Sequence, residues 1–182
     1  GYFATWLKDL LENHDQVTIA CHGLTHKCWS AYPKDEEGFL AALVEADVKL
    51  HKFAKDAWRP WFRAPAGYIA PWMAPIIAKA GFELDSSVNP SWIVRKKAGP
   101  WKDWNAVLKA LKDSGLVSRP WLCKFGLPTC GPALSIPILR NNARRVWKKL
   151  GPFVLPDETE ETVYWHVLDH GRKNGTWKPP LM

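Results

Sequence analysis

The sequence predicts an α/β domain with parallel strands, because short apolar runs alternate along the chain with segments of helical periodicity. The clearest helical pattern recurs at Phe39, Leu43, Ala46, Leu50 and Phe53. A chain of 182 residues suffices for one domain with a sizeable core. We therefore assign residues 1–172 to this domain and residues 173–182 to a loose C-terminal tail.

Helices and strands alternate regularly through the first half of the chain. Predicted helices span residues 4–12, 35–54 and 71–79. Predicted strands span residues 17–21, 60–63 and 82–85. Asp35 is placed to cap the second helix, whereas Pro71 opens the third and Gly81 ends it.

The second half is less regular. Residues 89–100 are predicted to be irregular, residues 104–111 helical, and the Pro- and Gly-rich stretch 115–132 to be loop-rich. A basic helix over 138–150 and a last strand over 163–167 complete the predicted order. No apolar stretch approaches the roughly 20 residues of a transmembrane helix.

The formal charge is +7, and much of it lies in the basic helix at Arg140, Arg144, Arg145, Lys148 and Lys149. A solvated helix face explains this cluster, as does peripheral contact with a membrane or a phosphate-bearing substrate. No RNA-module signature or Gly-rich phosphate loop accompanies it, so a nucleic acid is not expected as partner. The compartment stays open, with the cysteines and the basic helix favouring a cytoplasmic, membrane-associated location.

The twelve tryptophans and the four cysteines can each be explained in two ways. The tryptophans serve packing, and a few near a site could be flat platforms for sugar rings. The cysteines form pairs of equal spacing, Cys21/Cys28 and Cys123/Cys130. That spacing is wider than in most structural zinc sites, so buried thiols are favoured over a four-cysteine zinc module.

Two histidines four residues apart, His22 and His26, directly follow the predicted strand 17–21. This spacing lets two imidazoles converge on one divalent cation, and zinc is the expected metal. A structural histidine pair is the alternative. A catalytic zinc normally has three protein ligands, so a carboxylate is expected as the third.

Further candidate residues follow the other predicted strands. Arg63 can grip a carboxylate through paired hydrogen bonds or form an ordinary structural ion pair. The backbone at Ala66 and Gly67 can approach a ligand closely. Asp85 can tune a neighbouring group or form a turn. His166, at the end of the last strand, can protonate a leaving amine. Asp169 or His170 either competes for this role or only orients the proton donor.

These motifs resemble those of the polysaccharide deacetylase family, the carbohydrate esterases that share the nodulation-type deacetylase domain. The segment His22-Gly23-Leu24-Thr25-His26 resembles its metal-binding motif, and residues 62–68, Phe-Arg-Ala-Pro-Ala-Gly-Tyr, resemble its arginine motif. Residues 82–90 resemble a segment of the branch acting on exported or lipid-linked polysaccharides. Residues 163–166 resemble the final, histidine-bearing motif. The likeness spans residues 4–171.

The resemblance implies a distorted (β/α) barrel and a divalent, zinc-like ion held by His22 and His26. Arg63 would hold the catalytic carboxylate and His166 would act as general acid. Ala66, Gly67, Tyr68 and Asp85 would contact the substrate, with a backbone N–H near Ala66 meeting the oxyanion. The implied reaction removes an acetyl or formyl group from an amino sugar of a polysaccharide or a polyprenyl-phosphate-linked glycan.

One part of the family pattern is missing. Its opening strand with adjacent aspartates, which supply the base and the third metal ligand, is not found, so we expect a barrel lacking its first strand. The non-methionine start favours a fragment over a degenerate member that is unable to turn over substrate. The alternative function is a catalytically inactive carbohydrate-binding domain of the same fold.

Overall fold

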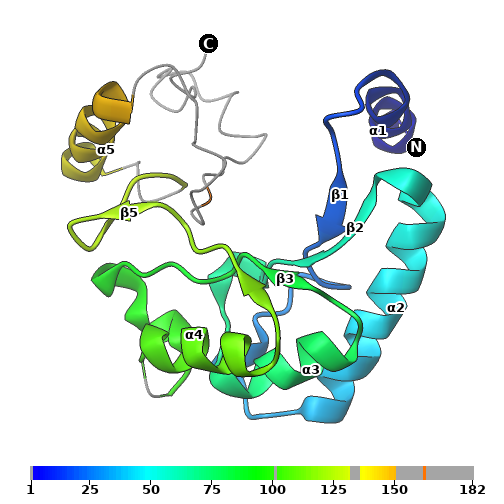
Figure 1. Cartoon of the computed structure of the whole chain (residues 1–182), viewed down its shortest axis with the longest axis horizontal. Coiled ribbons are helices and arrows are strands. Elements are labelled where there is room, and N and C mark those ends of the chain that lie inside the picture. The colour runs from blue at the N-terminus through cyan, green and yellow to red at the C-terminus, as the bar shows by residue number, and fades with distance from the viewer. Residues whose placement is uncertain (1, 101, 132–135, 151–161, 163–182) are drawn as a thin grey trace.

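The computed structural model describes residues 2–100, 102–131, 136–150 and 162. Four short strands form a parallel sheet in the order β1-β2-β3-β4 (Figure 1). They are β1 (Ile19–Cys21), β2 (Trp58–Phe62), β3 (Leu84–Asp85) and β4 (Val117–Ser118). Each strand is hydrogen-bonded to its neighbour in sequence, so the predicted α/β class with a parallel sheet is confirmed.

Helices precede and connect the strands, as the sequence pattern predicts. The α-helices are α1 (Tyr2–Asn13), α2 (Glu36–Ala54), α3 (Ala74–Lys79), α4 (Trp104–Asp113) and α5 (Pro137–Leu150). Short 3-10 helices are η1 (Trp29–Ala31), η2 (Lys55–Ala57), η3 (Pro65–Gly67), η4 (Pro71–Met73) and η5 (Trp92–Ala98). No helix in these described ranges is both long and apolar enough to cross a bilayer.

The core lies between α2, α3, α4 and the sheet. Phe39 and Leu43 of α2 are buried, as their helical spacing predicts. The Phe39 ring lies 6.1 Å from that of Phe62 on β2, which in turn lies 5.9 Å from the Phe82 ring. The Asp35 carboxylate accepts the Gly38 N–H at 2.9 Å, so the predicted cap of α2 is confirmed.

One prediction for the second half was wrong. The stretch 89–100, predicted as irregular, contains the 3-10 helix η5. The stretch 115–132, predicted as loop-rich, also contains strands that were not predicted: β4 and a hairpin of β5 (Cys123–Lys124) and β6 (Leu127–Pro128). These strands have two residues each, too few to show a periodicity, and β4 is fixed by its ladder to β3, with Val117 N donating to Glu83 O at 2.9 Å.

One later residue extends the parallel arrangement. Thr162 pairs with Trp121 in parallel, its N–H donating to Pro120 O at 2.7 Å and its carbonyl accepting the Leu122 N–H at 2.8 Å. The predicted last strand, 163–167, and the predicted tail, 173–182, lie outside the described residues.

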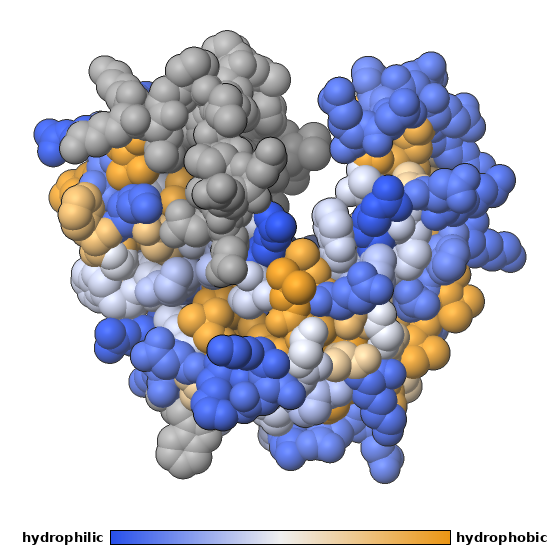
Figure 2. Space-filling model, in the orientation of Figure 1, coloured by the Kyte–Doolittle hydropathy of each residue, from blue (hydrophilic) through white to orange (hydrophobic). Residues whose placement is uncertain are grey.

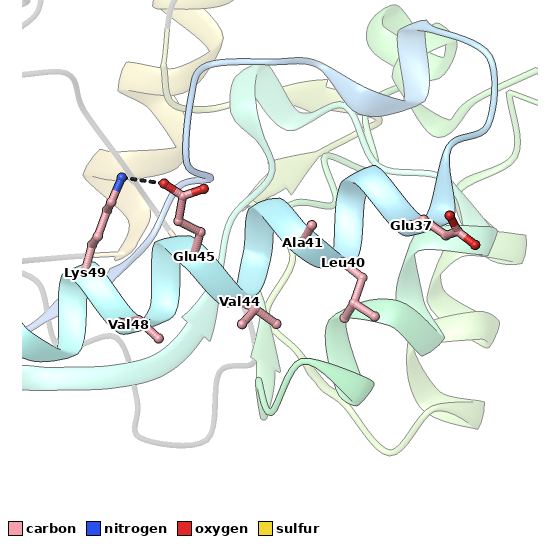
Figure 3. A pocket seen from close by; sticks show the side chains of 7 residues that line it. All are labelled: Glu37, Leu40, Ala41, Val44, Glu45, Val48 and Lys49. Carbon is pink, nitrogen blue, oxygen red and sulfur yellow. Dashed lines mark hydrogen bonds and ion pairs between the residues drawn. The ribbon is translucent and has the colours of Figure 1, made fainter.

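A shallow groove lies on the outer face of α2, opposite the buried Phe39 and Leu43 (Figure 3). Its lining comes from this helix alone: Glu37, Leu40, Ala41, Val44, Glu45, Val48 and Lys49. Glu45 and Lys49 form an ion pair at 2.5 Å along its edge. None of the predicted site residues lines this groove.

Candidate functional site

The predicted site residues gather because the sheet is parallel. His22 follows β1, Arg63 follows β2 and Ser86 follows β3, so all three leave the same, carboxyl edge of the sheet. Side chains at this edge are the usual ligand contacts of α/β folds. Figure 1 shows the adjacent order of the strands that produces this gathering.

His22 is oriented by the backbone of the neighbouring motif. Its Nδ1 lies 2.8 Å from the Arg63 carbonyl oxygen. A carbonyl oxygen only accepts, so Nδ1 carries the proton and the lone pair of the neutral ring lies on Nε2. A histidine with its second ring nitrogen bound to a carbonyl in this way is typical of metal ligands.

The ring of His26 lies close to that of His22. Their centroids are 5.4 Å apart and their planes meet at 73°. Two imidazoles bound to one tetrahedral zinc, with Zn–N of about 2.1 Å, place their ring centres about 5.3 Å apart. The observed separation therefore fits two ligands of a single ion.

The turn between the two histidines depends on Gly23. Its φ is +87°, a conformation that side-chain-bearing residues rarely adopt. A Cβ here would lie 3.0 Å from Thr25 O and 3.3 Å from the Pro65 ring. Gly23 thus lets the first motif turn tightly against the second.

A complete ligand set does not appear in the ranges that the structure describes. No three residues among their His, Cys, Asp and Glu converge on a point that could hold a metal. The two histidines fit part of a site, and no carboxylate of the described residues joins them as the expected third ligand. The four cysteines, all in the described ranges, do not form such a group either.

Arg63 connects three strands at this edge. Its backbone N–H donates to Cys21 O at 2.9 Å, and its guanidinium Nη2 donates to Ser86 Oγ at 2.8 Å. The guanidinium also lies over the Trp121 ring, 5.7 Å from its centroid. Trp121 is itself held by an Nε1–H bond of 2.7 Å to Ser86 O. The cation is thus positioned by named neighbours at the sheet edge.

Asp85 is fully buried and faces Ser87 rather than solvent. Ser87 donates twice to it, from its N–H to Oδ1 at 2.9 Å and from its hydroxyl to Oδ2 at 2.5 Å. The Ser87 hydroxyl oxygen accepts the Ala64 N–H at 2.8 Å. Asp85 therefore forms a turn and, through Ser87, supports the backbone next to Arg63.

Burial dominates the electrostatics of this carboxyl group. It raises the pKa of Asp85 to about 6, although the bonds from Ser87 and the charge of Arg63 act in the opposite direction. The carboxylate pays a desolvation penalty that its partners offset only in part.

The predicted substrate loop adopts an unusual turn. Ala66 has φ 52° and Gly67 φ +72°, so two successive residues are left-handed. The Lys97 ammonium donates to Ala66 O at 2.6 Å and lies 5.5 Å from the centre of the Tyr68 ring. Partial burial lowers the pKa of Lys97. No partner for the Ala66 N–H is found in the part of the chain described, which suits an oxyanion donor.

His166, the predicted general acid, lies outside the described residues, as do Asp169 and His170. The structure brings His22, His26, Arg63 and the loop 66–68 together at one edge. It adds Ser86, Ser87, Lys97 and Trp121, which the sequence analysis did not select. Two hydroxyls directly after a strand were a usable signal for the serines, whereas Lys97 and Trp121 are distant in sequence and gave none.

Comparisons with known proteins add no assignment. No family model matches the chain, and no match is found among curated proteins or among solved structures.

Proposed function

We propose that this chain is a metal-dependent hydrolase of the polysaccharide deacetylase type, built on a distorted (β/α) barrel. Its reaction would remove an acetyl or formyl group from an amino sugar of a polysaccharide or a lipid-linked glycan. The observation that carries the proposal is the oriented histidine pair, with Nδ1 of His22 bound to Arg63 O at 2.8 Å and ring centres 5.4 Å apart. The consecutive strand order agrees with a barrel of this type.

The residues present suit the metal in part. His22 and His26 would hold it, with a carboxylate as the further ligand. A divalent ion such as zinc polarises a substrate carbonyl and lowers the pKa of a bound water. The chain's own contribution would be to fix the imidazole orientation, through the Arg63 carbonyl, before substrate arrives.

Other residues would act on the substrate and on the base. The Ala66 N–H, held in a left-handed turn by Lys97, would donate to the oxyanion that forms when the amide is attacked. The Arg63 guanidinium would orient a catalytic carboxylate, and Ser86 and Trp121 fix its position. His166 would give a proton to the leaving amine.

An assay of acyl release tests the proposal. The full chain is incubated with Zn²⁺ and N-acetylated or N-formylated amino-sugar oligomers, and acetate or formate is measured. We expect His22→Ala to lower kcat/KM on the order of 1000-fold, because a metal ligand is lost. His51→Ala, which removes an exposed histidine of α2, serves as control and should change nothing.

If the chain binds glycan equally well with and without Zn²⁺ and releases no acetate or formate, the proposed hydrolase activity is refuted. That result would support a carbohydrate-binding domain of the same fold instead.

A further inference from the structure

Large apolar side chains are exposed on the segments that follow β3 and β4. Phe125, at the tip of the β5–β6 hairpin, is 89% exposed, Ile138 at the start of α5 is 77% exposed, and Trp92 on η5 is 57% exposed. Ile93 and Ile136 beside them are also exposed. We call these five residues the apolar rim. Exposed apolar groups gathered in this way mark interaction surfaces.

The segments that bear the apolar rim contact one another. Trp92 N donates to Gly126 O at 3.2 Å, which joins η5 to the hairpin tip. A Cβ on Gly126 would lie 2.7 Å from Trp92 Cδ1, so the contact is close. Helix α5 packs against β6, and Figure 1 draws the hairpin and α5 at the same flank. Figure 2 shows apolar surface over α5.

The hairpin tip is held in a conformation that suits few residues. Phe125 has φ 57° and Gly126 φ 69°, the pair of left-handed residues that a two-residue hairpin turn of type I′ requires. Asn or Asp is the usual first residue of such a turn, because the left-handed conformation is strained for a residue such as phenylalanine. A strained, almost fully exposed aromatic ring at a projecting tip has no role in the packing of the described residues.

The part of the sequence that contains the apolar rim is strongly basic. Residues 86–150 contain thirteen Lys and Arg but only two Asp and no Glu, so this part supplies the excess positive charge of the chain. Arg95 and Lys96 follow Trp92 on η5 and are exposed. Arg145 shares a face of α5 with Ile138, seven residues earlier. None of these three forms a salt bridge within the described residues.

We propose that the apolar rim docks on the surface of an anionic lipid bilayer. A projecting aromatic tip, an interfacial tryptophan and unpaired basic side chains are the combination that binds such a surface. The rim belongs to the segments leaving the carboxyl edge of the sheet, the edge that also bears His22 and Arg63. Docking would therefore hold the candidate site at the headgroup layer, where a lipid-linked glycan presents its sugar. The choice of substrate rests on the proposed function, whereas the docking itself does not.

Vesicle sedimentation tests the docking. The full chain is mixed, in EDTA, with phosphatidylcholine vesicles with or without about one third phosphatidylglycerol, at low and high salt. We expect binding to the anionic vesicles only, weakened by salt. Phe125→Asn combined with Ile138→Gln should raise the Kd about tenfold or more, since apolar insertion is lost. Asn suits the left-handed turn, so the hairpin should fold at least as well.

Val48→Gln is the matched control, because Val48 is exposed on α2 and away from the rim. It should leave the Kd unchanged. Absence of binding by the unmodified chain, or equal binding by all variants, would overturn the docking proposal. Loss of self-association in the Phe125→Asn/Ile138→Gln variant, with vesicle binding unchanged, would also overturn the proposal. That result would indicate that the apolar rim binds a second copy of the chain.

The hydrolase proposal and the docking proposal can be tested independently of each other. Vesicle binding in EDTA does not require a metal, and His22→Ala should bind vesicles as the unmodified chain does. Release of acetate or formate from a soluble oligomer should in turn be unchanged by Phe125→Asn. Loss of only one of these activities identifies which proposal is wrong.

Discussion

Arg63 illustrates how single residues define the candidate site. Its carbonyl orients His22, its N–H continues the ladder to Cys21, and its guanidinium binds Ser86. The sequence motif indicated a role only for the guanidinium, which makes one of these three contacts. The carbonyl contact depends on the register between β1 and β2, and no local pattern reveals that register.

A testable consequence at this scale concerns Asp85. Its folded-state pKa of about 6 lies above the ordinary value of 3.8, so the folded protein binds this proton more tightly than the unfolded chain. The stabilising contribution is complete below pH 3.8 and is lost as pH rises through 6. Above that pH, the buried carboxylate lowers the free energy of unfolding by about 3 kcal/mol.

Asp85→Asn isolates this effect, because an amide can accept the Ser87 N–H and donate to the Ser87 hydroxyl oxygen without carrying a charge. Urea unfolding of both proteins from pH 4 to pH 7 should show the unmodified chain losing about 2 kcal/mol relative to the variant, since pH 4 already lies above the unfolded pKa. Parallel pH profiles would show that the Asp85 carboxyl does not titrate as described.

The elements themselves were predictable where their pattern was long. The 19 residues of α2 repeat an apolar spacing over several turns, and Asp35 caps its start. Strands β4, β5 and β6 have two residues each and are formed by pairing with other segments, which no local pattern reveals. The hairpin has Phe125-Gly126 at its turn instead of Asn-Gly, so the usual turn signal is missing.

The turn η3 offers a prediction at the scale of elements. Gly67 has φ +72°, and a Cβ there would lie 3.0 Å from Trp121 Cη2, the ring that lies beneath Arg63. Gly67→Ala should therefore lower the free energy of unfolding by about 2 kcal/mol. It should also displace the Trp121 ring from Ser86 O.

Gly115→Ala provides the comparison, since Gly115 has φ +77° but no atom within 4 Å of an added Cβ. Gly115→Ala should lower the free energy of unfolding by about 1 kcal/mol less than Gly67→Ala does, because it introduces only backbone strain. Equal losses in chemical denaturation would show that Trp121 does not constrain this turn.

At the scale of the whole molecule, the parallel sheet brings four separate segments to one edge. Each of its strands neighbours the next in sequence, so residues after β1, β2, β3 and β4 meet although they are far apart in the chain. The alternating pattern placed His22 and Arg63 directly after predicted strands, and the observed parallel sheet brings these two positions to one edge. The pattern could not predict the apolar rim, because side-chain exposure depends on how the hairpin and α5 pack.

Zinc binding by the histidine pair is the most direct test of the central claim. Competition with a chromophoric chelator measures the zinc affinity of the full chain, of His22→Ala and of His26→Ala, with His51→Ala as control. We expect each of the first two substitutions to weaken zinc binding at least about tenfold, and the control to leave it unchanged. Zinc affinity that is the same in all four proteins would contradict a metal site at His22 and His26.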